Sequence, residues 1–188
     1  MRCFIAVDLD GKIKRRLTAL QQMLCRKAEI KKSDVKWVRP ESMHMTLKFL
    51  GEVADKKIVD VCKITEKIAS QYKAFEVDIE SVGFFGGKSA RVLWVGTGAG
   101  GENLCRLQKD LEQQLALAGW PKENRKFSGH LTLCRIKNFK AGTRLAELSE
   151  DYRNHKAGTI SADSISVYQS QLTPAGAIYT VLANYKLE

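Results

Sequence analysis

The sequence lacks an apolar run long enough to cross a membrane. Its apolar stretches, such as FIAV at 4–7, have the length of strands and fall far short of the roughly 20 residues that a membrane helix needs. The opening segment MRCFIAVDLD also lacks the long apolar core and the small-residue cleavage site of a secretion signal. We therefore expect a cytoplasmic protein without a membrane span.

Cysteine and proline are sparse, and their scarcity excludes further classes. The five cysteines are odd in number and scattered, with no Cys-x-x-Cys pair, so we expect free thiols and neither a zinc finger nor a redox couple. Only three prolines occur, and no low-complexity or Pro-rich linker divides the chain. A chain of 188 residues, 44% hydrophobic and 28% charged, has the size and composition of one globular domain.

Strand and helix patterns follow each other along this chain. Apolar runs and alternation predict strands over 2–9, 43–50, 75–85, 90–96, 159–169 and 177–187, and helical spacing predicts helices over 11–29, 58–68, 104–118 and, shorter, 144–155. A GGKS turn at 86–89 joins two of the strands into a hairpin. Residues 1–188 are therefore expected to form one α+β domain built from two similar halves.

Basic residues exceed acidic ones by a wide margin. Thirty-one lysines and arginines against twenty-one acidic residues give a net charge of +10. Such a surplus on a small domain favours an anionic partner, most often a polynucleotide. The alternative is a solvated helix surface, because KIKRR at 12–16 and KAEIKK at 27–32 lie in segments with helical spacing.

A glycine-rich stretch, GTGAGG at 96–101, matches the dinucleotide-binding pattern G-x-G-x-x-G and lies between a predicted strand and a predicted helix. Two features argue against that function. The preceding strand belongs to a hairpin, not to a parallel sheet, and no acidic residue ends a second parallel strand about twenty residues later. We interpret the stretch as a turn.

One four-residue pattern, His-x-Thr-Leu, occurs twice. It lies in HMTLKF at 44–49 and in HLTLCR at 130–135, and it uses two of the three histidines in the chain. Because side chains alternate between the two faces of a strand, the His and Thr of each copy share one face and the apolar residues point into the core. Two such strands side by side present two imidazoles and two hydroxyls to one cleft.

These groups suit acid–base attack at phosphorus. The ordinary pKa of histidine is near 6.5, so one imidazole can accept a proton while the other donates one. Threonine hydroxyls can donate hydrogen bonds to phosphoryl oxygens without adding charge. Such a reaction needs no metal.

Other interpretations of the two motifs explain less. A single histidine on a strand is more often a structural hydrogen-bonding group, but two matching copies reverse that preference. A zinc site lacks a third ligand on the His face; Cys134 comes nearest, and its counterpart in the first motif is Lys48. A nucleophile at Ser42, Ser128 or Cys134 lacks the nucleophile-elbow context.

The residues around the motifs resemble the two-histidine phosphoesterases, and among them the bacterial and archaeal RNA 2′,3′-cyclic phosphodiesterases, also called 2′-5′ RNA ligases. The similar blocks run through nearly the whole chain: RCFIAVDL, WVRPESMHMTLKFLGEV, ARVLWVG, RKFSGHLTLCRIK and YQSQLTPAGAIYTVL. One departure is Ser128-Gly129, where the family commonly has a proline. We expect it to loosen the start of that strand and to shift His130 slightly, without removing a catalytic group.

The resemblance implies a two-lobed fold with a pseudo-twofold axis, in which antiparallel sheets line a central basic cleft and helices pack outside. It implies that His44 donates a proton to the departing 3′ oxygen while His130 accepts one from water, which opens the cyclic phosphate to a 2′-phosphate. Symmetry allows either histidine either role, and the reverse reaction, 2′-5′ ligation, exchanges them. The implied partner is RNA with 2′,3′-cyclic phosphate ends, bound by a monomer without a cofactor, a metal or an obligatory protein partner.

Four further side chains, those of Thr46, Thr132, Lys48 and Arg135, are expected to bind the substrate. The resemblance places Thr46 and Thr132 on the phosphate oxygens, in agreement with the strand geometry. Lys48 shares the predicted face of His44 and either reaches the anion or stays solvated.

Arg135 matches an arginine that the family has near the phosphate, so we expect it to bind substrate. Simple alternation nevertheless turns it to the face opposite His130, and only a strand end or a bulge after Cys134 resolves this conflict. The third histidine, His155, lies between basic residues in a predicted polar helix, and we interpret it as a surface residue.

Two other functions fit the same cleft. One is a non-catalytic RNA-end binder on the same fold, and the other is a phosphodiesterase of small cyclic nucleotides. A binder could dispense with either histidine, whereas this sequence keeps both together with both threonines. A small-nucleotide enzyme would not need so much positive charge beyond the pocket.

Overall fold

The computed structural model describes residues 1–174 and 176–188. Its strands are β1 (Arg2–Asp8), β2 (Val35–Trp37), β3 (His44–Glu52), β4 (Phe75–Gly86), β5 (Ala90–Thr97), β6 (His130–Ile136), β7 (Lys156–Ala162), β8 (Ser164–Thr173) and β9 (Gly176–Lys186). Its helices are α1 (Gly11–Lys27), α2 (Asp55–Ala69), α3 (Gly101–Leu117) and α4 (Phe139–Asp151), with 3-10 turns at Lys32–Asp34 and Pro40–Ser42. The α+β class is confirmed.

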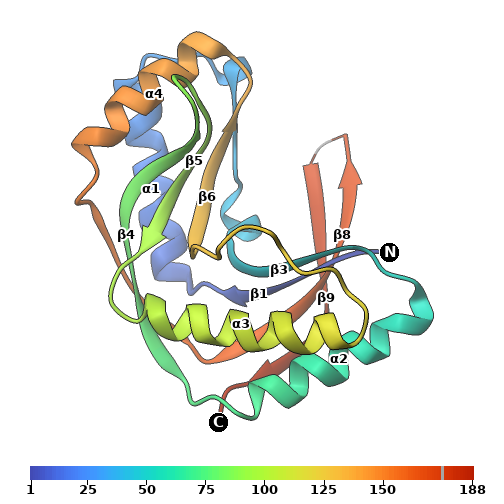
Figure 1. Ribbon diagram of the computed structural model, residues 1–188. Coiled ribbons are helices and arrows are strands. Elements are labelled where there is room, and N and C mark those ends of the chain that lie inside the picture. The colour runs from blue at the N-terminus through green and yellow to red at the C-terminus, as the bar shows by residue number, and fades with distance from the viewer. Residues whose placement is uncertain (175) are drawn as a thin grey trace.

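The strands form two antiparallel sheets, one in each lobe (Figure 1). The first sheet has the order β3-β1-β8-β9, and the second has the order β2-β6-β5-β4-β7. Helices α2 and α3 pack on the first sheet and on each other, whereas α1 and α4 pack on the second (Figure 1). The motif strands β3 and β6 belong to different sheets and contact each other. The expected two-lobed arrangement with outer helices is therefore present.

The apolar residues of both motifs lie in one continuous core. Met45 and Leu47 of β3 and Leu131 and Leu133 of β6 are all buried in it, as strand alternation predicted. Burying a side chain of this size contributes about 1.5–3 kcal/mol, so each motif strand is held firmly from behind. Within the described residues, no helix is both long and apolar enough to cross a membrane.

Helix α1 shows how local sequence sets an element's bounds. Asp10 is its N-cap, and the carboxylate accepts a hydrogen bond from the Ile13 amide at 2.7 Å. Such a cap contributes about 1 kcal/mol. Arg26 and Lys27 lie in the last turn, where positive charge stabilises the negative end of the helix dipole.

The prediction of one continuous strand over 159–169 is wrong. Asp163 separates β7 from β8, and the two strands belong to different sheets. β7 pairs with β4 in the second sheet, whereas β8 pairs with β1 in the first. The chain crosses between lobes here, and periodicity cannot show such a crossing because both strands have the same alternation. Strand β2 was not predicted, because its three residues are too few for a periodic pattern.

The last helix also differs from its prediction. It covers Phe139–Asp151 instead of 144–155, and the Asn138 side chain caps it by accepting a hydrogen bond from the Ala141 amide at 3.1 Å. His155 therefore lies after the helix. It is half-buried, so it is only partly exposed at the surface where the sequence placed it, and burial lowers its pKa.

The glycine-rich stretch at 96–101 is a turn, as predicted. β5 ends at Thr97 and is antiparallel to both of its neighbours, β4 and β6, so no parallel nucleotide-binding unit forms. Gly100 caps α3 with φ +81°, and a Cβ at this position would lie 1.9 Å from the carbonyl oxygen of Glu76. This glycine is required by backbone packing and not by a phosphate.

Candidate active site

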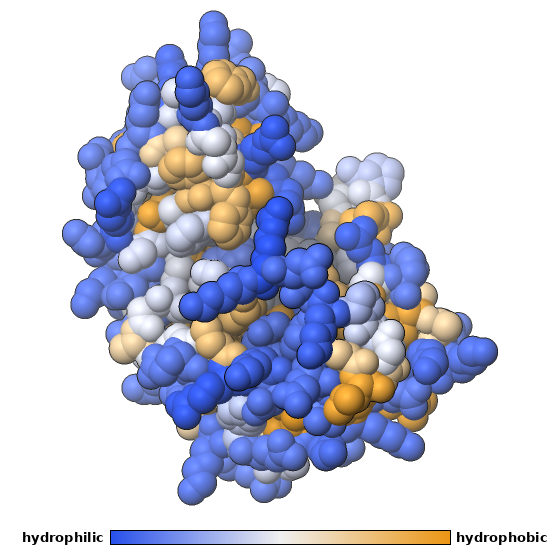
Figure 2. All heavy atoms as spheres, viewed as in Figure 1, coloured by the Kyte–Doolittle hydropathy of each residue, from blue (hydrophilic) through white to orange (hydrophobic). Residues whose placement is uncertain are grey.

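The motif strands border a cleft of about 1040 Å³. His44 and Thr46 line it from β3, and His130, Thr132 and Arg135 line it from β6. The structure thus brings together five of the six predicted site residues. Figure 2 shows hydrophilic side chains gathered over the middle of this face, at the junction of the two lobes.

A bulge in β3 breaks the predicted alternation after Thr46. Ala6 of β1 pairs with Thr46, and Ile5 pairs with Lys48, so Leu47 is an extra residue on β3. Leu47 and Lys48 are consequently both buried. The phase of the strand reverses at this point, as bulges generally cause.

Lys48 does not lie where alternation placed it. It does not line the cleft, and its side chain is only 4% exposed. Its ammonium forms an ion pair with Glu112 of α3 at 2.9 Å and donates to the carbonyl of Pro121 at 2.8 Å. The bulge turns this lysine inward, so the expected contact with substrate is replaced by an internal one.

The second motif strand carries a bulge at the same place. Trp94 of β5 pairs with Thr132, and Leu93 pairs with Cys134, which leaves Leu133 as an extra residue on β6. The reversed phase turns Arg135 to the face of the threonine, and its side chain is exposed in the cleft. The bulge therefore resolves the conflict over Arg135.

The second bulge also places the side chain of Cys134 in the interior. This thiol is fully buried behind the cleft, and desolvation raises its pKa to about 12. A thiol that stays protonated is a poor metal ligand and a poor nucleophile. Within residues 1–174 and 176–188, no group of three or more His, Cys, Asp and Glu side chains is placed to hold a metal ion.

Aromatic rings enclose His44. Its imidazole stacks on Phe4 with 4.6 Å between ring centroids and meets the edge of Tyr179 at 5.2 Å. Burial lowers its pKa to about 4, while a hydrogen bond with the Ser42 backbone and the charge of Asp8 act in the opposite direction. His44 is therefore neutral in the free protein at neutral pH, so in this state it does not carry the proton that a proton donor needs.

Asp8 is held in place beside His44. It pairs with His44 in the ladder between β1 and β3. Its carboxylate accepts hydrogen bonds from the Ser166 hydroxyl at 2.8 Å and from the Tyr168 hydroxyl. The Asn184 amide donates to Ser166 at 2.8 Å and completes the chain of contacts. The charge of this fixed carboxylate favours the charged form of the imidazole.

His130 is oriented by the backbone carbonyl of Ser128, two residues before it. Its Nδ1 lies 2.7 Å from the carbonyl oxygen of Ser128, so Nδ1 donates and Nε2 of a neutral ring is left as the acceptor. The edge of the ring meets Phe85 at 5.0 Å between centroids. Gly129 is buried, and a Cβ there would lie 2.8 Å from Leu104, so the residue before His130 packs tightly.

Sequence reasoning missed several residues of this cleft. Phe49 was expected in the core by strand alternation, and this expectation is wrong: its side chain is 57% exposed and lines the cleft. It takes the same place in the first motif that Arg135 takes in the second. Comparing the last letters of HMTLKF and HLTLCR would have found this pair. Arg125 and Lys126 also line the cleft, and the charge of KENRKFSG was their only signal.

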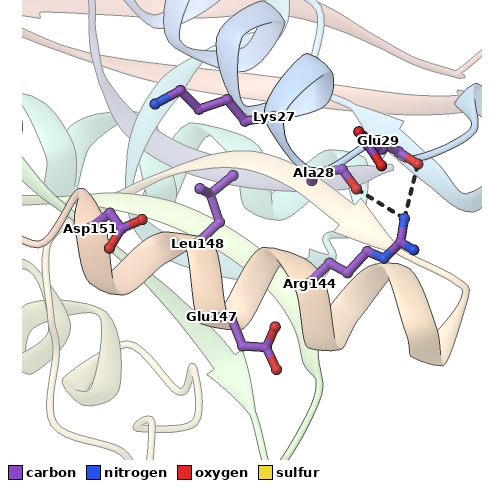
Figure 3. Close-up of a pocket in the computed structure, with 7 residues that line it drawn as sticks. All are labelled: Lys27, Ala28, Glu29, Arg144, Glu147, Leu148 and Asp151. Atoms are coloured by element: carbon purple, nitrogen blue, oxygen red, sulfur yellow. Dashed lines mark hydrogen bonds between the residues drawn. The ribbon is translucent and has the colours of Figure 1, made fainter.

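A second hollow, of about 430 Å³, lies between the end of α1 and α4 (Figure 3). Its Arg144 donates to the carbonyl oxygens of Ala28 and Glu29 at 3.3 and 3.2 Å and thereby caps the end of α1 (Figure 3). Its other charged residues are of both signs, and neither motif reaches it. This arrangement stabilises a helix end and offers no acid–base pair.

Comparisons with known proteins concern the chain as a whole. A Methanothermobacter thermautotrophicus protein named RNA 2′,3′-cyclic phosphodiesterase is 33% identical over 188 residues, which are 100% of this chain and 99% of the relative. An Aquifex aeolicus protein of the same name is 36% identical over 154 residues, 81% of each chain. This chain is therefore similar along its whole length to proteins with that name.

Solved structures share the fold. A Thermus thermophilus crystal structure matches with a TM-score of 0.80 and 26% identity, covering 100% of this chain and 98% of that chain. Escherichia coli LigT complexed with 3′-AMP also has a TM-score of 0.80, at 23% identity, covering 99% and 97%. At that identity the likeness to LigT shows the fold alone.

The family described as LigT like Phosphoesterase matches twice, over residues 7–94 and 95–179. Each matched segment carries one copy of His-x-Thr-Leu. The lobes do not follow this division, because the first sheet combines β1 and β3 with β8 and β9. Since each half supplies one motif and the fold unites both in one cleft, the chain belongs to the LigT-like phosphoesterase family.

Proposed function

We propose that this protein hydrolyses RNA 2′,3′-cyclic phosphate ends to 2′-phosphate ends. The observation that carries the proposal is the meeting of both His-x-Thr motifs at one cleft. The relatives named RNA 2′,3′-cyclic phosphodiesterase point to the same substrate. One chain supplies both motifs, so we propose a monomeric, single-domain cytoplasmic enzyme.

In this proposal His130 is the proton acceptor. Its Nδ1–H is held by the Ser128 carbonyl, which leaves Nε2 to take a proton from water. The water oxygen then forms a bond to phosphorus while the bond between phosphorus and the 3′ oxygen breaks. Thr46 and Thr132 donate to the phosphoryl oxygens, and Arg135 balances their negative charge.

His44 is the proton donor and gives its proton to the departing 3′ oxygen. Because its pKa is about 4 in the free protein, His44 must take up this proton from solvent when the substrate binds. A cyclic phosphate carries one negative charge, and an anion within about 4–6 Å of an imidazole favours the charged ring. We therefore infer that binding of the cyclic phosphate and uptake of a proton by His44 are linked.

The same groups can join RNA ends. If a 5′ hydroxyl replaces water, His130 takes its proton and His44 again protonates the 3′ oxygen, which leaves a 2′-5′ bond. Ligation from the cyclic phosphate therefore keeps the two roles, in contrast to the exchange expected above. Cleavage of that bond reverses both proton transfers and exchanges the two roles. The proposal includes this reversible ligation as a side activity of the cleft.

We also propose that the reaction needs no metal. Both proton transfers and the charge balance are assigned to side chains, and the described residues offer no three-ligand group. A resident metal therefore has no function in this scheme.

The test is an oligonucleotide that ends in a 2′,3′-cyclic phosphate. The expected product carries a 2′-phosphate, identified by its resistance to a 3′-specific phosphatase. His44→Ala and His130→Ala should each lower kcat by about 10²- to 10⁴-fold while the variants stay folded, because each removes one proton-transfer group. An RNA-end binder would give no product, and a small-nucleotide enzyme would prefer a cyclic mononucleotide.

A further inference from the structure

The segment 121–127 connects α3 to the motif strand β6 and crosses the face where the lobes meet (Figure 1). It has no regular secondary structure. Within the described residues, none of its backbone groups bonds to another backbone group. An irregular segment of this kind needs other contacts to hold one conformation.

Those contacts come from one buried ion pair. The carbonyl of Pro121 accepts from the Lys48 ammonium at 2.8 Å, and the amide of Glu123 donates to the Glu112 carboxylate at 2.6 Å. The same oxygen of Glu112 lies 2.9 Å from the Lys48 ammonium. Each partner of the ion pair therefore holds one backbone group of the loop: Lys48 holds the carbonyl of Pro121, and Glu112 holds the amide of Glu123.

The pair is well placed for this task. Lys48 is 4% exposed and Glu112 is 13% exposed, so water competes little for either charge. Gln108 also donates to Glu112, at 3.3 Å. Removing one partner of such a pair leaves an unpaired buried charge, whereas replacing both by apolar residues is often tolerated.

The loop presents free cations to the cleft. Arg125 and Lys126 line the cleft, are exposed, and form no ion pair among the described residues. Phe127, which follows them, also lines the cleft. Proteins that bind single-stranded nucleic acid commonly combine cationic side chains, which contact phosphates, with aromatic rings, on which bases stack.

The chemistry of the substrate fixes which part of the RNA the loop can meet. A 2′,3′-cyclic phosphate ends the chain, so all remaining nucleotides lie on its 5′ side. We propose that Lys48 and Glu112 are a positioning pair that holds the 121–127 loop so that Arg125 and Lys126 contact the phosphates of these nucleotides. This inference rests on the proposed function and adds a binding region for the RNA chain.

Two sets of variants and two substrates test the inference. Lys48→Met combined with Glu112→Leu removes the anchor without leaving a buried charge, and Glu112→Gln is a milder second variant. Arg125→Ala combined with Lys126→Ala removes the proposed contacts. The matched control is Asp110→Ala on the same helix, which removes the acceptor of the 2.6 Å hydrogen bond from the Tyr72 hydroxyl.

The substrates are a cyclic-phosphate RNA of about ten nucleotides and a dinucleotide, because single-strand sites span about 4–16 nucleotides. Both sets of variants should raise KM for the long RNA by about tenfold and KM for the dinucleotide by less than about twofold. The slope of log KM against log salt concentration should decrease by about 0.7 for each lost phosphate contact, hence by about 1.4 for the two cations. Combining both sets should add little, and the control should match the wild type.

Equal losses for both substrates would overturn the inference and leave Lys48–Glu112 as a merely structural pair. An unchanged KM for the long RNA would overturn it as well. If the wild type cleaves neither substrate, the proposed function fails. The loop is then judged by the dissociation constant of a labelled RNA of the same length with a plain 3′ hydroxyl, which should rise about tenfold in the variants.

Discussion

Replacing His44 with glutamine should flatten the pH dependence of folding stability between about pH 6.5 and pH 4. Burial against Phe4 and Tyr179 keeps this imidazole neutral in the folded protein, and its pKa falls from 6.5 to about 4. The unfolded chain therefore binds the proton first as the pH falls. The stability that neutral His44 contributes is complete above pH 6.5 and is lost as the pH falls to about 4.

The size of the effect follows from the two pKa values. Their difference, 6.5 minus about 4, is about 2.5 pH units. At about 1.4 kcal/mol for each unit, one ring can contribute at most about 3.5 kcal/mol of unfolding free energy, and the wild type should lose about 3 kcal/mol of it by pH 4, where the folded ring is half protonated. The glutamine variant has no such group. The difference in unfolding free energy between the wild type and the variant should therefore decrease by about 3 kcal/mol between neutral pH and pH 4.

Urea unfolding followed by circular dichroism, at steps from about pH 7 to about pH 4, measures this difference. His155 also has a lowered pKa, but it is present in both proteins and cancels in the comparison. His155→Gln serves as the control and should leave the His44-dependent difference intact. Parallel curves for the wild type and His44→Gln would refute the reasoning, because they would mean that His44 is solvated in the folded protein.

Binding of a cyclic phosphate at neutral pH should take up part of a proton, measured by calorimetry in buffers of different ionisation enthalpy, and His44→Gln should abolish this uptake. Turnover should survive EDTA; loss of activity that a divalent ion restores would require a metal mechanism. Arg135→Gln should raise KM by about tenfold, because it removes a charge-assisted contact to phosphate; an unchanged KM would place this side chain off the substrate. Gly100→Ala should destabilise by more than about 2 kcal/mol, since its Cβ would lie 1.9 Å from the Glu76 oxygen, whereas Gly119→Ala, with open space around it, should cost about 1 kcal/mol in thermal unfolding.

The sequence by itself determined the reacting groups and the class of fold. His-x-Thr-Leu predicts both its surface and its buried face from alternation alone, and the structure has Leu131 and Leu133 in the core as expected. The hairpin at 86–89 and the turn at 96–101 were also predicted from a few neighbouring residues, because the backbone geometry of glycine decides both. Signals of this kind depend on residues close together in the chain, so one sequence suffices to find them.

Tertiary structure alone decided which neighbours of the motifs reach the cleft. The bulges at Leu47 and Leu133 arise from pairing with β1 and β5, and they send Lys48 inward and Arg135 outward. No pattern within either strand encodes that extra residue, because a bulge is defined against its partner strand. For the same reason the ion pair between Lys48 and Glu112, 64 positions apart, and the low pKa of His44 emerge only when distant elements pack around these groups.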